Sequence, residues 1–115
     1  MHLILTTIFL GNLYVTSYRS TVSQTDDSPY ITSIGDRVGT HGVAVSPDLL
    51  KSGKVKYGDW LYLDGIGFKK VNDVMNARHV NRLDVWVPNY QKEKEFDKKF
   101  RGKKIKVYIV KRSFK

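Results

Sequence analysis

Two aspartates, Asp73 and Asp84, lie in runs of strand-forming residues that a polar connector joins. In the second run, R-L-D-V-W-V, strict alternation puts Arg82, Asp84 and Trp86 on one face of a strand. Because aspartate is uncommon in strand interiors, an aspartate facing the same way as a tryptophan needs an explanation. A carboxylate in a cleft with an aromatic ring suits sugar binding and acid–base chemistry. We expect the two carboxylates to lie on neighbouring strands and to share one cleft.

Asp84 also has a structural interpretation, in which it lies on a solvated sheet face and is neutralised by Arg82. Four further residues are candidates for substrate binding: Thr32, Ser33, Asp48 and Tyr62. The hydroxyls of Thr32 and Ser33 can instead be satisfied locally in a turn. Asp48 can instead serve the first turn of a helix, where a negative charge is favourable.

Length and composition limit the classes of function. A chain of 115 residues is long enough for one domain with a single core. It contains no cysteine, which excludes disulfides, thiolate metal sites and thiol nucleophiles. His2, His41 and His79 lack the spacing of metal ligands, so we predict no metal and no cofactor. The net charge of +9 indicates an anionic partner, such as nucleic acid, an acidic membrane or an anionic cell-wall polymer.

The hydrophobic pattern predicts six or seven short strands and two short helices. Strands are expected over 14–18, 41–45, 59–63, 68–74, 83–87 and 104–111, and helices over 46–51 and 90–100. Ser46 is the expected N-cap of the first helix, with Pro47 at its first position. Asp64-Gly65 predicts a tight turn between two strands. So many short strands in a small domain favour a closed β-barrel, since closure removes exposed edges.

The first thirteen residues, MHLILTTIFLGNL, are apolar but too short to span a bilayer as a helix. They are interpreted as a signal or anchor remnant or as an extra strand that leads into residues 14–18. The main domain is expected over residues 14–115.

Several blocks occur in a characteristic order: T-S-Y (16–18), S-P-Y-I-T-S-I-G (28–35), G-V-A-V-S-P (42–47), G-D-W-L-Y-L-D-G-I-G-F (58–68), V-N-D (71–73), N-R-L-D-V-W (81–86) and K-V-Y-I-V (106–110). In this order the chain resembles the three-aspartate (3D) domain. That domain is a double-psi β-barrel related to membrane-bound lytic murein transglycosylases and stationary-phase muralytic proteins. The resemblance implies a mainly β fold, a six-stranded double-psi β-barrel with one or two short helices.

The resemblance also implies site roles. Asp84 aligns with the catalytic acid/base of the family and Asp73 with its partner, while the third aspartate of the family is Ser46 here. Both glycines that follow the first of these aspartates in the family are absent after Asp73. Asp48 lies two residues beyond Ser46 and is the nearest carboxylate to the missing one.

The implied activity is non-hydrolytic cleavage of peptidoglycan glycan strands to 1,6-anhydro-muramyl products. Thr32 and Ser33 would fix the sugar, and Trp86 or Tyr62 would stack on it. The expected protein is exported to the cell envelope, or is phage-encoded and acts on the wall, as a monomer without a stable membrane span. One alternative is a glycan-binding barrel without turnover. Another is a basic nucleic-acid-binding barrel, although the lysines are spread along the chain and no stacking surface of aromatics is evident.

Overall fold

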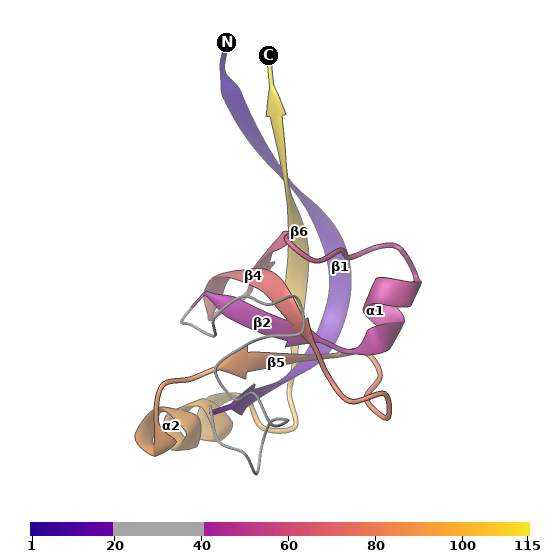
Figure 1. The fold of residues 1–115 in the computed structure, drawn as a ribbon. Coiled ribbons are helices and arrows are strands. Elements are labelled where there is room, and N and C mark those ends of the chain that lie inside the picture. The colour runs from indigo at the N-terminus through magenta and orange to yellow at the C-terminus, as the bar shows by residue number, and fades with distance from the viewer. Residues whose placement is uncertain (20–40) are drawn as a thin grey trace.

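The computed structural model describes residues 1–19 and 41–115. Six strands form a closed barrel in the order β1-β5-β2-β4-β3-β6, with two short helices outside it (Figure 1). The strands are β1 (Leu3–Tyr18), β2 (Gly42–Val45), β3 (Trp60–Leu63), β4 (Gly67–Val74), β5 (Arg82–Trp86) and β6 (Lys104–Phe114). The helices are α1 (Pro47–Lys51) and α2 (Tyr90–Phe100). The predicted mainly β barrel with two short helices is therefore confirmed.

The barrel is mixed. The β1–β5 and β2–β4 pairs are parallel, whereas the β2–β5, β3–β4, β3–β6 and β1–β6 pairs are antiparallel. Strands adjacent in the sequence are often not adjacent in the barrel. For example, β2 lies between β4 and β5. This topology is compatible with a double-psi barrel.

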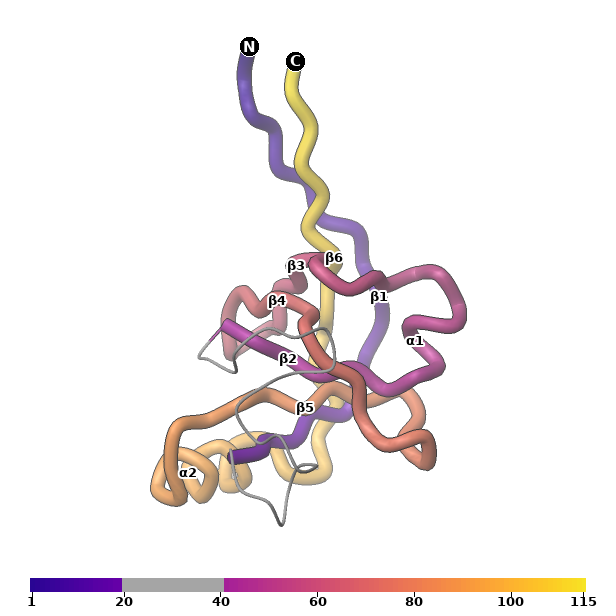
Figure 2. Tube along the Cα trace, in the orientation of Figure 1, coloured from indigo at the N-terminus to yellow at the C-terminus, as the bar shows by residue number. Residues whose placement is uncertain are grey.

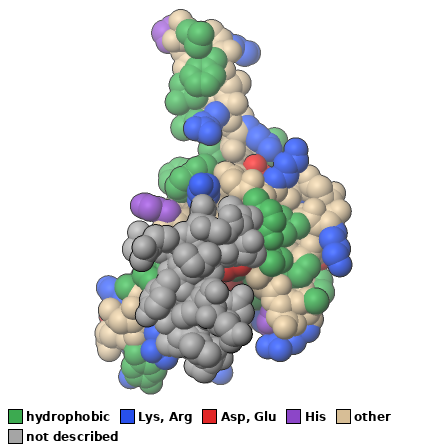
Figure 3. All heavy atoms as spheres, viewed as in Figure 1, with side chains coloured by type: hydrophobic (Ala, Val, Ile, Leu, Met, Phe, Trp, Pro, Cys, Tyr) green, Lys and Arg blue, Asp and Glu red, His purple; other side chains and the backbone are tan. Residues whose placement is uncertain are grey.

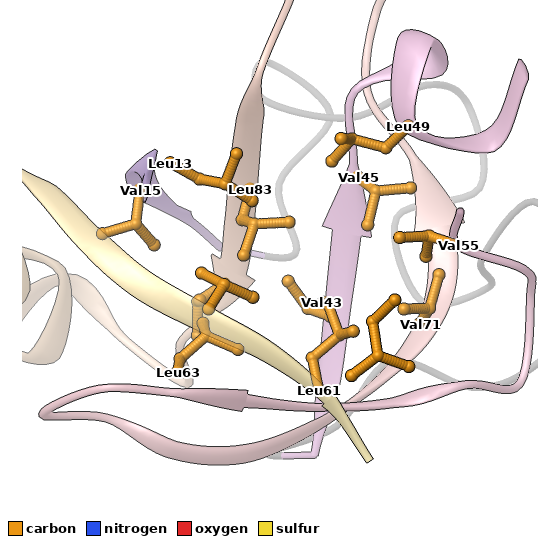
Figure 4. Close-up of a cluster of buried hydrophobic side chains, with 13 residues drawn as sticks. Leu13, Val15, Val43, Val45, Leu49, Val55, Leu61, Leu63, Val71 and Leu83 are labelled. Carbon is orange, nitrogen blue, oxygen red and sulfur yellow. The ribbon is translucent and has the colours of Figure 1, made fainter. Parts of the chain in front are cut away.

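Alternating apolar residues fill the barrel from every strand. Figure 4 shows the resulting cluster of 13 buried side chains, to which Leu49 of α1 and Val55 also contribute. Leu83 and Val85 of β5 face inward, as the alternation predicted, and both are buried. Asp84 must therefore point out of the barrel wall, because successive side chains of a strand alternate between its faces.

The two helices cover the outside of the barrel. Asn89 caps α2, because its side chain accepts a hydrogen bond from the Lys92 backbone N–H. Phe96 and Phe100 of α2 pack together at 4.8 Å between ring centroids and contact the core. Ser46 occupies the N-cap position of α1, as predicted, but its hydroxyl makes no capping bond.

The strand β1 is longer than the predicted 14–18 segment. It begins at Leu3 and pairs with β6 almost throughout, with one irregularity between Phe9 and Gly11. Within the described part of the chain, residues 3–6 of β1 and 111–114 of β6 pair only with each other. They form a two-stranded ribbon that projects from the barrel and carries both chain ends, as Figures 1 and 2 show.

No helix within residues 1–19 and 41–115 is long and apolar enough to cross a bilayer.

Candidate active site

The candidate site is built around Asp84 on the outer side of β5. Ala44 of β2 is the register partner of Asp84 on one side and of Asp73, on β4, on the other. Register partners point their side chains to the same face. The two carboxylates therefore flank one strand, across a residue whose side chain is only a methyl group. Our expectation that the two aspartates lie on neighbouring strands is wrong, because β2 separates β4 from β5.

An irregularity in β4 puts Asp73 in this position. Val43 pairs with Val71, but the next residue of β2, Ala44, pairs with Asp73, so Asn72 is passed over. Without this bulge Asn72 would lie opposite Ala44. Asn72 is buried and lies against Gly42, where a Cβ would come within 2.7 Å of the Asn72 side-chain nitrogen. A glycine at position 42 thus makes room for the bulge that positions Asp73.

Two residues of β1 lie on the same outer face of the barrel as Asp84. Thr16 is the register partner of Asp84, and its hydroxyl donates a hydrogen bond to Asp84 Oδ1 at 2.8 Å. Tyr18 follows two residues later on the same face and is buried. Burial raises the pKa of the Tyr18 phenol, and the charges of Asp73 and Asp84 raise this pKa further. The phenol is therefore neutral at neutral pH.

The Asp84 carboxyl has a strongly shifted pKa. Burial raises its pKa from 3.8 to about 6, while the hydrogen bond from Thr16 acts in the opposite direction. The negative charges of Glu93, Asp73 and Asp97 raise the pKa as well. A carboxyl with a pKa near 6 is partly protonated near neutral pH, which is what a general acid needs.

The acidic neighbours Glu93 and Asp97 come from α2, one turn apart. Arg19, just after β1, forms an ion pair with Glu93, with 3.1 Å between Arg19 Nε and Glu93 Oε1. The same guanidinium lies 5.3 Å from the centre of the Tyr90 ring. These contacts hold α2 beside the end of β1, so that its acidic side faces the Asp84 region.

Arg82 does not neutralise Asp84 as the structural interpretation required. Its guanidinium lies 5.4 Å from the centre of the Tyr14 ring. No ion pair between Arg82 and Asp84 is found in the described part of the chain. The net effect of the surroundings on Asp84 is to raise its pKa, whereas a directly paired arginine would lower it.

Ser46 and Asp48 hold the start of β5. The Ser46 hydroxyl accepts a hydrogen bond from the Arg82 backbone N–H at 3.0 Å. Both Asp48 oxygens accept from the Asn81 backbone N–H, at 3.1 and 3.2 Å. Asn81 has a positive φ of 56°, which is unusual for a residue other than glycine, so its neighbours must fix this conformation. Asp48 is thus engaged in fixing the backbone, and the structure does not bring it to Asp84.

Trp86 and Tyr62 are separated by the barrel. Trp86 is half-buried on the same strand as Asp84 and lines an open groove of about 580 Å³ between β5 and α2. Tyr62 lies on β3, which is three strands from β5 in either direction round the barrel. Its ring packs outside the barrel against Phe68 and Tyr108, at centroid distances of 5.0 and 6.3 Å. Tyr62 therefore does not belong to the Asp84 site.

Thr32 and Ser33 lie outside the described residues. The sequence interpretation gave no role to Thr16, Tyr18, Glu93 or Asp97, which the structure places around Asp84. Thr16 and Tyr18 were detectable, because they alternate on a predicted strand and so share one face. No local pattern in the sequence predicts that α2 lies beside Asp84.

Within residues 1–19 and 41–115 no group of three or more histidine or acidic side chains could hold a metal ion. Comparison with known proteins gives no further assignment: no family model matches the chain, and no curated protein matches its sequence.

Proposed function

We propose that this protein cleaves the glycan strands of peptidoglycan as a lytic transglycosylase, with Asp84 as the single acid/base. The fold would be the double-psi barrel of the three-aspartate domain, with which the closed six-stranded barrel is compatible. The observation that carries the proposal is the environment of Asp84. Its carboxyl is partly buried, is held by Thr16 and has a pKa of about 6.

The reaction needs one group that first donates and then accepts a proton. Protonated Asp84 gives its proton to the glycosidic oxygen as the bond to C1 breaks with oxocarbenium character. The resulting carboxylate then removes the proton of the muramic acid 6-hydroxyl, whose oxygen attacks C1. A 1,6-anhydro ring forms, the acid is regenerated and no water is consumed. No second carboxylate is needed as nucleophile or base.

Three neighbours assist in this scheme. Thr16 fixes the orientation of the Asp84 carboxyl through its hydrogen bond. Asp73, across Ala44, raises the pKa of Asp84 and so helps to keep Asp84 protonated. Trp86, on the same strand, offers a ring on which a sugar can stack.

The test is the release of soluble fragments from purified sacculi, analysed by mass spectrometry. The parent protein should release fragments lighter by one water than hydrolytic products, and Asp84→Asn should release none. Since general acid–base catalysis contributes about 10²–10⁴-fold, even a partial loss should be measurable. Asp64→Asn makes the same chemical change in the exposed turn after β3 and should retain activity. A folded parent that releases nothing would refute the enzymatic proposal.

Glycan binding without cleavage is the second candidate. The observation that favours it is that no residue in the described part of the chain replaces the third aspartate of the family. Ser46 and Asp48 both accept hydrogen bonds from backbone N–H groups, so Asp84 and Asp73 are the two carboxylates left for the site. Sacculi that retain the parent protein but lose no fragments would support this candidate.

A further inference from the structure

The projecting ribbon carries an outward face that is unusually apolar for an exposed surface. Register pairs in β1 and β6 put Leu3 opposite Phe114 and Leu5 opposite Arg112 on this face of the ribbon, and Phe9 opposite Tyr108 where the same face reaches the barrel. We define the apolar face by its five most exposed apolar side chains, whose exposed fractions are all above one half: Leu3 53%, Leu5 59%, Phe9 52%, Phe68 55% and Phe114 65%.

The apolar face continues from the ribbon onto the barrel. The Phe9 ring lies 5.4 Å from that of Tyr108, Tyr108 lies 6.3 Å from Tyr62, and Tyr62 lies 5.0 Å from Phe68. This row of rings crosses β1, β6, β3 and β4 on the outer side of the wall. A contiguous exposed apolar surface of this kind marks an interaction site.

The charged side chains of the two strands that form the ribbon are all positive. Residues 1–18 and 98–115, which include both strands of the ribbon, contain no aspartate or glutamate. Lys111, Arg112 and Lys115 are exposed on the ribbon itself. On the side seen in Figure 3, hydrophobic and basic side chains lie along the projecting part of the molecule, among other side chains and backbone.

We propose that the apolar face adsorbs to the surface of a bilayer that contains anionic phospholipids. Aliphatic and aromatic side chains flanked by cations bind at such an interface, because the apolar groups enter the acyl boundary while the cations meet the headgroups. Long lysine and arginine side chains can reach the headgroups from either side of the ribbon.

The geometry limits how deep the contact goes. Among the residues that the structure describes, β6 beyond Val110 pairs only with β1, so within that part of the chain the outer backbone edges of the ribbon have no strand partner. Unpaired backbone groups cannot enter the hydrocarbon core without a large cost in free energy. The ribbon therefore lies in the headgroup region and does not cross the bilayer.

Charge decides between a lipid surface and a second copy of the chain. Two copies that met through the apolar face would bring Arg112 and its basic neighbours together without any acidic partner in the ribbon. Like charges in contact oppose association. The leucines at the tip also favour lipid over glycan, since sugars stack on aromatic rings and not on aliphatic side chains.

The absence of cysteine from the chain allows a direct test with the full-length protein. Leu5→Cys, labelled with an environment-sensitive fluorophore, should show a blue shift and higher emission with phosphatidylglycerol-containing vesicles. Val80→Cys is the matched control, since Val80 is 63% exposed and lies on the connector before β5. Its emission should not change. An unchanged spectrum at Leu5→Cys would overturn the proposal.

Cosedimentation with the same vesicles measures affinity. Leu5→Ser/Phe114→Ser should lower the partition coefficient at least about tenfold, because two large apolar contacts are lost. Tyr57→Ser/Val80→Ser removes two exposed apolar side chains elsewhere and should bind like the parent. Thermal melting of both variants checks that they are folded.

Two replacements of charge test the electrostatic part. Lys111→Gln/Arg112→Gln should weaken binding to anionic vesicles about tenfold, since each cation near the surface contributes appreciably. Lys54→Gln/Lys56→Gln lowers the net charge equally in an exposed loop and should have a much smaller effect. Equal effects of both pairs, or concentration-dependent self-association without vesicle binding, would overturn the proposal.

Discussion

The properties of Asp84 come from the residues around it and not from its own strand alone. Its hydrogen bond comes from β1, one negative neighbour comes from β4, and two further negative charges come from α2. Burial is the largest cause of its raised pKa. Ionising Asp84 therefore opposes folding. This effect on stability, and the contribution of each neighbour to the pKa of Asp84, can both be measured.

Asp84→Asn should stabilise the folded protein at pH 7 to 8 and have little effect near pH 4. The pKa of Asp84 is raised on folding from 3.8 to about 6, so the folded state binds more protons between these values. Stability should fall as pH rises through this window and stay lower above it. Removing the charge should recover up to about 3 kcal/mol at pH 7. Urea unfolding at pH 4 and pH 7.5 measures this, and a loss of stability at both values would contradict the predicted penalty.

Thr16→Val should raise the pKa of Asp84 further, because the hydrogen bond that stabilises the carboxylate is lost while the shape is kept. Glu93→Gln and Asp73→Asn should each lower that pKa by removing a negative charge. Carboxyl chemical shifts followed by NMR across pH 3 to 9 give these values. At alkaline pH, where little of the acid form remains, the variant with the highest measured pKa of Asp84 should keep the most activity. A pKa that does not respond to Thr16→Val would remove Thr16 from the site.

At the scale of the elements, the bulge in β4 and the strand β2 decide how far apart the two aspartates lie. The bulge passes over Asn72, whose buried side chain fills the space above Gly42. Among the described residues, Asn72 Oδ1 has no hydrogen-bond partner. The positions of Asp73 and of the Asn72 side chain are therefore coupled through this bulge.

Gly42→Ala should destabilise the protein by about 1–3 kcal/mol, as overpacking in a tight site does. The new Cβ would lie 2.7 Å from Asn72 Nδ2 and 2.9 Å from Asn72 Oδ1, closer than real contacts allow. Adding Asn72→Ala removes both atoms, so the double variant should recover part of the loss. Urea unfolding of Gly42→Ala, Asn72→Ala and the double variant completes a double-mutant cycle. Additive losses would show that the two residues do not interact.

At the scale of the whole molecule, the net charge of +9 is distributed unevenly. The segment 98–115 is rich in lysine and arginine and contains no acidic residue, whereas several acidic side chains surround the Asp84 face. A basic protein with this distribution can be concentrated on an anionic wall while its carboxylates remain available.

Binding to isolated sacculi should therefore weaken as salt rises past about 0.15 M, where the Debye length falls to about 8 Å. Binding to chitin, an uncharged glycan, should depend much less on salt. Cosedimentation across a series of salt concentrations tests this. Tighter binding to one defined DNA sequence than to a scrambled one at physiological salt would favour a nucleic-acid partner instead.

The sequence by itself determined part of the local structure of the described residues. Alternation in residues 82–87 predicted which side chains of β5 face inward, and α2 was predicted over the residues where it occurs. Such predictions succeed because periodicity and capping depend on neighbours in the chain. The extension of β1 to Leu3 has a different origin. It depends on pairing with β6, about a hundred residues away, and apolar composition alone does not specify that partner.

Only the tertiary structure decided which candidate residues meet. The order of the strands placed β2 between Asp73 and Asp84, and it put Tyr62 on the opposite side of the barrel. It also assigned Asp48 to the Asn81 backbone and brought Thr16 to Asp84. A strand pattern specifies the face on which a side chain lies, but the identity of the neighbouring strand depends on how the whole sheet closes. For this reason the sequence identified Asp84 as a candidate, while the barrel determined its hydrogen bond, its charged neighbours and its pKa.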